Sequence, residues 1–204
     1  MAESRGLERM VFFTDAVVAI AITLLILPLV DRVPEAAADG GTLVDYLADN
    51  GTQLGALLLS FLVIARLWLV HHGLFQHVAT TSPLLLWLNL AWALTIVVLP
   101  LPTSLIAEFE STPLAVVLYI GTMFVSSLLL ALMLVVIKRT PGLEAASNPL
   151  GDERVPSSFV TVGAFAAALI LGSVFPMINY WALLLLLLIG PISRLVRRRV
   201  TRTR

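Results

Sequence analysis

The chain has 204 residues, of which 59% are hydrophobic and 13% charged, and its formal net charge is zero. A mean hydropathy of +0.97 excludes an ordinary soluble domain, and the neutral balance gives no general attraction to nucleic acid. The chain contains no cysteine, which excludes disulfides and thiolate chemistry.

Six apolar segments are long enough to cross a bilayer, because a helix of about 20 residues spans the hydrocarbon core. In chain order they cover residues 10–30, 53–75, 84–106, 114–137, 158–175 and 180–196. There is no clear internal repeat. The sequence therefore predicts an all-α membrane protein with six transmembrane helices in a single domain, residues 1–204.

Charged residues divide between the two sides of these predicted helices. Arg5 and Arg9 precede the first helix, basic residues lie at both ends of the connection 138–154, and the tail 194–204 is rich in arginine. The opposite side carries the acidic connection 31–52, in which Arg32 is the one basic residue and Thr42 predicts a helix start. The positive-inside rule then places both termini in the cytoplasm.

The N-terminal segment has an alternative interpretation as a cleavable signal peptide, because two arginines precede its apolar run and three alanines follow at 36–38. Glu3, Glu8 and Asp15 fit a basic leading region poorly. We therefore expect this segment to remain as the first membrane helix.

An aspartate, Asp15, lies about one turn inside the charged end of the first predicted helix. An ionised carboxylate within a membrane helix costs roughly 2.5–3.5 kcal/mol on insertion scales, which favours a specific role. A buried carboxylate needs hydrogen-bond donors, and Arg66 is expected either to pair with it or to reach the cytoplasmic surface. The other donors at a similar depth are Arg9, Trp68, His71, His72 and Asn89.

An aliphatic stripe runs along the side of the first helix that faces away from Asp15. Ordinary packing produces the same pattern, so the stripe alone does not distinguish a packed helix from a pore-lining one. Pro28 removes the helical partner of the carbonyl four residues before it and predicts a kink. The stripe comprises Ile20, Leu24 and Leu27, with Thr23 on its flank, Phe13 at one end and Asp31 at the other.

The order Arg9, Phe13, Thr14, Asp15 resembles the R-x-x-x-F-S-D motif of the transmembrane protein 175 family, potassium channels of bacteria and lysosomes. Thr14 stands where the family has serine. The second and third predicted helices also resemble those of the family, so the resemblance covers about half the chain.

The resemblance implies a tetramer in which the first helix of each subunit lines a central pore. By aligned position, Ile20, Leu24 and Leu27 would form hydrophobic rings with Thr23 beside them, and Arg9 and Asp15 would tie the helix to its neighbours. A hydrophobic ring gates by dewetting. Asp31 would belong to an acidic outer mouth that concentrates cations, although a solvated acidic loop explains the same residues.

We therefore expect a passive, potassium-preferring homotetrameric channel in a bacterial-type inner membrane. Its partners would be lipids and monovalent cations, with no cofactor, nucleic acid or enzymatic activity. His71 and His72 point about 100° apart and His77 lies near a loop, so no metal site is expected. Two alternatives remain open: a secondary transporter that uses Asp15 as a proton or cation relay, and a non-conducting membrane scaffold.

Overall fold

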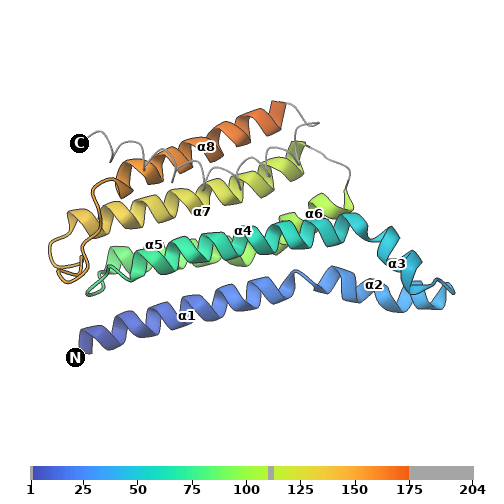
Figure 1. The fold of residues 1–204 in the computed structure, drawn as a ribbon, viewed down its shortest axis with the longest axis horizontal. Helices are drawn as coiled ribbons and strands as arrows, with labels where there is room; N and C mark the ends of the chain where they lie inside the picture. Colours follow the sequence, from blue (N-terminus) through green and yellow to red (C-terminus); the bar gives the residue numbers. More distant parts are fainter. Residues whose placement is uncertain (1, 110–112, 175–204) are drawn as a thin grey trace, which may run out of the picture.

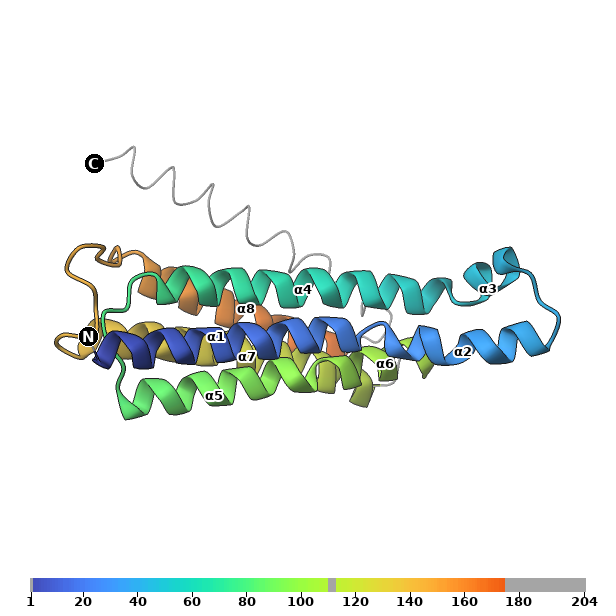
Figure 2. The ribbon, with the colours of Figure 1, turned by 90° about the horizontal axis from the view of Figure 1, so that it is seen from below.

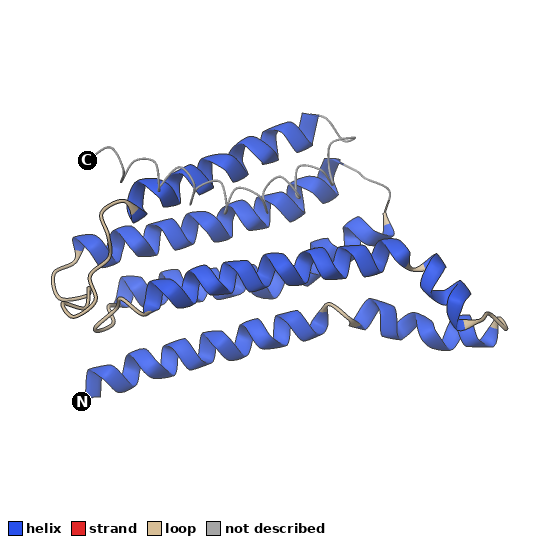
Figure 3. Ribbon diagram, in the orientation of Figure 1, coloured by secondary structure: helices blue, strands red, loops and turns tan. Residues whose placement is uncertain are grey.

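The computed structural model describes residues 2–109 and 113–174, and the regular elements in these ranges are all helices (Figure 3). This confirms the all-α fold class. The helices are α1 (Ala2–Leu24), α2 (Leu27–Ala38), α3 (Leu43–Asp49), α4 (Gly51–Phe75), α5 (Pro83–Val98), α6 (Pro100–Glu108), α7 (Pro113–Arg139) and α8 (Arg154–Val174).

Within the described residues, five helical segments are long and apolar enough to cross a membrane. They correspond to the first five predicted helices, and the protein is a multi-pass membrane protein. The sixth predicted helix, 180–196, and the basic tail, 194–204, lie outside the described residues. The five segments are Arg5–Ala38, Gly51–Phe75, Pro83–Glu108, Leu114–Arg139 and Arg154–Ser173.

The long helices lie side by side, with α1 at one side of the bundle and α8 at the other (Figure 1). Helix α1 packs on α4 and α5, α5 packs on α7, and α7 packs on α8. Seen from below, α1 runs between α4 and α5 (Figure 2). We call the end with the N-terminus and the connections 76–82 and 140–153 the loop end, and the opposite end the α3 end.

The predicted first helix extends farther than expected and is interrupted. Helix α1 ends at Leu24 and α2 begins at Leu27, so the break precedes Pro28, which sits in the first turn of α2 where its missing N–H costs no hydrogen bond. Residues 31–38, assigned to the acidic connection from sequence, therefore belong to this helix. A helix of 34 residues is about 50 Å long, which is longer than the hydrocarbon core of about 30 Å is thick.

Helix α3 begins where the sequence predicts a helix start. Gly40, in the left-handed region at φ 73°, ends α2, and Thr42 then caps α3. The Thr42 hydroxyl accepts a hydrogen bond from the Asp45 amide at 3.3 Å, and the Asp45 carboxylate accepts from the Thr42 amide at 3.0 Å. This reciprocal capping box closes the turn between α2 and α3.

The cap predicts a pH dependence of α3. The hydrogen bonds from Thr42 lower the pKa of Asp45 below its ordinary value of 3.8. A carboxyl group whose pKa is depressed in the folded state stabilises the fold above its unfolded pKa, and this stabilisation is lost as the pH falls through the folded pKa. We expect the protection of the α3 amides from hydrogen exchange, relative to an unfolded chain at the same pH, to fall below about pH 4. The variant Asp45→Asn should show no such loss of protection; an identical pH profile would contradict the assignment.

The third predicted helix is also interrupted, since α5 ends at Val98 and α6 begins at Pro100. Close to this break, a buried chain of hydroxyls joins α4, α6 and α7. The Thr103 hydroxyl donates to the Leu99 carbonyl at 2.8 Å, so Ser60 must donate to Thr103 across 2.8 Å. The Tyr119 hydroxyl therefore donates to Ser60, at 2.9 Å. Each of these three hydroxyls therefore donates to an acceptor.

Because the three hydroxyls donate in one direction, from Tyr119 to Ser60 to Thr103, removing different hydroxyls should lower the stability by different amounts. In Ser60→Ala the Tyr119 hydroxyl becomes a buried donor without an acceptor, at a cost of about 1–3 kcal/mol. Tyr119→Phe removes a donor and leaves only a lone pair of Ser60 unused, so about 0.5–1.5 kcal/mol is expected. Unfolding in detergent measures both; a larger loss for Tyr119→Phe would show that the donors point the other way.

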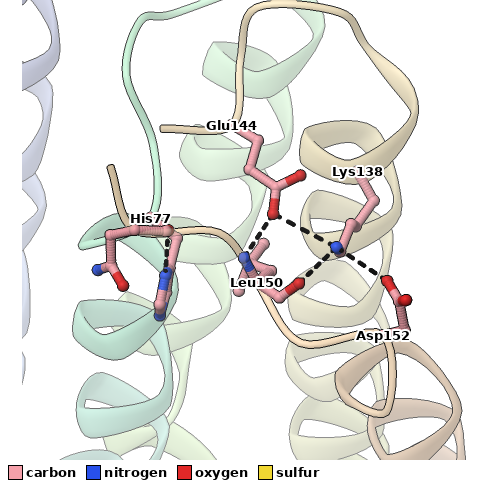
Figure 4. Close-up of polar contacts among 6 residues, drawn as sticks. His77, Lys138, Glu144, Leu150 and Asp152 are labelled. Atoms are coloured by element: carbon pink, nitrogen blue, oxygen red, sulfur yellow. Dashed lines mark hydrogen bonds and ion pairs between the residues drawn. The ribbon is translucent and has the colours of Figure 1, made fainter. Parts of the chain in front are cut away.

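At the loop end, two connections far apart in sequence are joined (Figure 4). The Ala145 amide donates to the His77 carbonyl and the Ala79 amide to the Leu143 carbonyl, each at 2.8 Å, and His77 Nδ1 donates to the Asn148 carbonyl. Lys138 on α7 contacts the carbonyl of Leu150 and the carboxylates of Glu144 and Asp152.

Helix α8, which follows this connection, begins at Arg154, about one turn before the predicted start. Ser157 lies in the first turn of the helix, where its hydroxyl donates to the Arg154 carbonyl.

Candidate functional site

A buried polar network fixes α1 to α4 and α5 near the loop end. Thr14 is fully buried, and its hydroxyl donates to the Met10 carbonyl at 2.9 Å and accepts from the Asn89 amide at 2.8 Å. The Asn89 carbonyl oxygen lies 2.7 Å from Nε2 of His71, which is also fully buried. Because the Asn89 amide is used by Thr14, its carbonyl oxygen accepts, and His71 Nε2 carries the hydrogen.

His71 is held in place by aromatic rings as well as by Asn89. Its ring stacks on Trp92 of α5, with centroids 4.2 Å apart and planes 11° from parallel, and lies 4.4 Å from the ring of Phe75. The imidazole therefore joins α4 to α5 while Asn89 joins α5 to α1. Thr14, at the serine position of the motif, is thus bonded to Asn89 of α5 and, through Asn89, linked to His71 of α4.

Asp15 accepts a hydrogen bond from a different residue than Thr14 does. The indole N–H of Trp68 on α4 donates to the Asp15 carboxylate at 2.7 Å, and Asp15 is partly buried. The Trp68 ring lies 5.3 Å from that of His72, which in turn contacts Gln76 at 3.1 Å. Of the donors predicted for Asp15, Trp68 donates to it, whereas Asn89 donates to Thr14 and His71 donates to Asn89.

The two predicted arginine partners of Asp15 occupy different places. Arg9 is exposed on α1, and no hydrogen bond or ion pair in the described part of the chain joins it to Asp15. Arg66 is partly buried on α4.

The opposite face of α1 and α2 is exposed along its whole length. Ile20 is 59% exposed, Leu24 39% and Leu27 46%. Phe13 and Asp31, at the two ends of the stripe, are also exposed, and the flanking Thr23 hydroxyl donates to the Ile20 carbonyl at 2.7 Å. The buried face lies on α4 and α5 and carries Met10, Thr14, Val18, Ala21, Leu25 and Leu29. The helix is thus held from one side and leaves the aliphatic stripe uncovered in a single chain; the pore role of the stripe stays a prediction.

A second set of contacts, for which no role was predicted, holds α2 at the α3 end. Arg32 forms an ion pair with Glu108 of α6 and donates to the Asn50 side chain, at the junction of α3 and α4, at 3.1 Å. The signal for it was present, since Arg32 is the one basic residue of an acidic segment. Asp31, Glu35 and Asp39 nearby on α2 or at its end are exposed.

Residues 9–100 match the sequence model of a family described as endosomal/lysosomal potassium channel TMEM175, which confirms the resemblance seen in the motif. A potassium channel of Streptomyces collinus is 41% identical over 97 residues, which are 48% of this chain and 46% of the relative. A human protein named endosomal/lysosomal proton channel TMEM175 is 36% identical over 114 residues, or 55% of this chain and 22% of that protein. The chain thus spans about half the length of the first of these relatives and about a fifth of the second.

A solved structure shows the same fold over nearly the whole chain. The crystal structure of a lysosomal potassium-selective channel TMEM175 homolog from Chamaesiphon minutus superposes with a TM-score of 0.75. The match covers 93% of this chain and 98% of the other at 23% sequence identity. The family model therefore matches the first half, which holds the polar network and the stripe, while the structural match extends into the second half.

Proposed function

We propose that this protein, whose first half matches the TMEM175 channel family, is a passive, potassium-preferring cation channel. It assembles as a homotetramer in which α1 and the start of α2 line a central pore. The observation that carries this proposal is the division of α1 into two faces. One face is anchored by Thr14 and Asp15 to its own subunit, and the other exposes an aliphatic stripe that copies of the chain would cover.

In the proposed channel, Ile20, Leu24 and Leu27 form successive hydrophobic rings. A cation that crosses such a ring must give up water without receiving oxygens in return, so small changes of ring width decide between closed and conducting states. The Thr23 hydroxyl keeps free lone pairs after donating to its own helix and lies next to the rings. Selectivity for potassium is expected to be modest, because these groups do not form cages of carbonyl oxygens.

The proposed orientation puts the loop end in the cytoplasm of a bacterial-type cell, together with both termini. Asp31 then stands on the stripe at the outer mouth, where like charges from each subunit attract cations. Potassium is the permeant ion, and the proposal involves no cofactor and no enzymatic step.

Ion flux from liposomes that contain the purified protein tests this proposal. The relatives are named as channels for potassium or for protons, so both fluxes should be measured on the same vesicles. Collapse of an imposed potassium gradient without a counter-ion gradient supports the channel. Potassium movement that occurs only against proton movement favours the transporter that uses Asp15. Folded, oligomeric protein without any flux favours the scaffold, and a folded monomer contradicts a pore built from copies of α1.

A further inference from the structure

Helix α2 is held at two points on the side away from the exposed stripe. The Leu29 carbonyl accepts a hydrogen bond from the Tyr46 hydroxyl of α3 at 2.6 Å, and Leu29 itself is buried. About one turn farther, Arg32 reaches Glu108 and Asn50 with its two terminal nitrogens. These contacts tie α2 to α3, to the start of α4 and to the end of α6.

The contacts close into a ring. Asn50 is 6% exposed, its amide donates to the Tyr46 carbonyl at 2.9 Å, and its oxygen accepts from Arg32. The Asn50 side chain therefore has one orientation, and the path Leu29–Tyr46–Asn50–Arg32 returns to the helix on which it began. The two terminal nitrogens of Arg32 donate to acceptors on two different elements. Lysine has a single ammonium nitrogen and does not reproduce this geometry.

This ring of contacts holds α2 at a point far from the polar anchor of α1. The polar anchor of α1 at Thr14 and Asp15 lies about 25 Å away along the helix, and the break at Leu25–Ile26 separates the two. The regular helical hydrogen bonds are interrupted at the break, so α1 and α2 do not form one unbroken helix. Helix α2 therefore depends on its own polar contacts as well as on its buried leucine.

We propose that Arg32 is a positioning residue. It fixes the distance of α2, and of its stripe residues Leu27 and Asp31, from the axis of the proposed pore. This inference rests on the proposed channel function for its effect on flux, but not for the placement of α2. Arg32 points away from the stripe's exposed face toward Asn50 and Glu108, so it acts through α2 and not by touching the ion.

A spin label on α2 tests the placement directly. The chain has no cysteine, so a label at Val33→Cys, an exposed position of α2, reports from one site. In Arg32→Gln and in Glu108→Gln we expect loss of the ordered component of the spectrum. The exchanged pair Arg32→Glu with Glu108→Arg should regain part of it. The matched control is Asp39→Asn, which removes an acidic charge from the same region without touching the ring.

Potassium flux is measured for the same variants without the label. In a conducting wild type we expect flux to change severalfold in Arg32→Gln and to return toward the wild-type value in the exchanged pair. An unchanged spectrum in Arg32→Gln, or an equal change in Asp39→Asn, overturns the inference. A loosened α2 with unchanged flux also overturns it. A wild type that does not conduct refutes the proposed function instead, and the spectra still decide whether Arg32 holds α2.

Discussion

Replacing Leu24 with asparagine is expected to raise potassium flux through the reconstituted protein by about tenfold, which corresponds to a barrier about 1.4 kcal/mol lower. Leu24 stands on the exposed stripe of α1, at the last residue before the break. In the proposed pore its side chain offers methyl groups to a partly dehydrated cation. An amide at the same place supplies an oxygen and holds water, so the ring stays wetted. Ile20→Asn should act in the same direction.

The control for this experiment is Leu94→Asn, because Leu94 is an exposed leucine of α5 outside the stripe. It introduces the same amide without placing it in the proposed pore, and its flux should equal that of the wild type. Equal increases in all three variants would indicate general leakage of disturbed protein. No increase for either Ile20→Asn or Leu24→Asn, in folded tetramers, would remove these residues from the conduction path.

Removing Asn89 is expected to lower the stability of the protein and to loosen α1 from its neighbours. This side chain is fully buried and serves both Thr14 of α1 and His71 of α4. In Asn89→Leu the Nε2–H of His71 becomes a buried donor without an acceptor, which costs about 1–3 kcal/mol. The loss should appear as a lower free energy of unfolding in detergent and as looser association of α1.

A matched control lies on the same helix. Thr95 is also buried, but its hydroxyl donates to the Trp92 carbonyl of its own helix. Thr95→Val keeps the shape and removes only this local bond, so we expect a loss below about 1 kcal/mol, in the range usual for membrane proteins. If both variants lose the same free energy, Asn89 does not join the helices in the way its contacts indicate.

The positions of the membrane helices could be predicted from hydropathy, because a long apolar segment in a bilayer satisfies all its backbone hydrogen bonds as an α-helix. The continuation of the first helix through residues 31–38 could not. That segment contains charged residues and an internal proline, Pro34, which are typical of a connection. It is helical here because Arg32 and Leu29 find partners on α3, α4 and α6, and these partners follow from tertiary structure.

The candidate site was predictable only in part, because its contacts between helices also depend on tertiary structure. Periodicity alone separates the stripe of α1 from Asp15, since 100° per residue fixes relative directions on one helix. Which donor meets Asp15 depends on how α4 and α5 are rotated, and periodicity does not give that rotation. Ser60, Thr103 and Tyr119 show the limit clearly, because they share no spacing signal and meet only through packing.

The hydrogen bonds of α1 set an order of events during synthesis. Trp68 stands 53 residues after Asp15, and Asn89 stands 75 residues after Thr14. At about 5–20 residues per second, the ribosome supplies Asn89 some 4–15 s after the motif it must meet. Helix α1 is therefore made before the residues that bind it on α4 and α5. The bond from Trp68 to Asp15 can form first, and the bond from Asn89 to Thr14 can form only after more of the chain has been made.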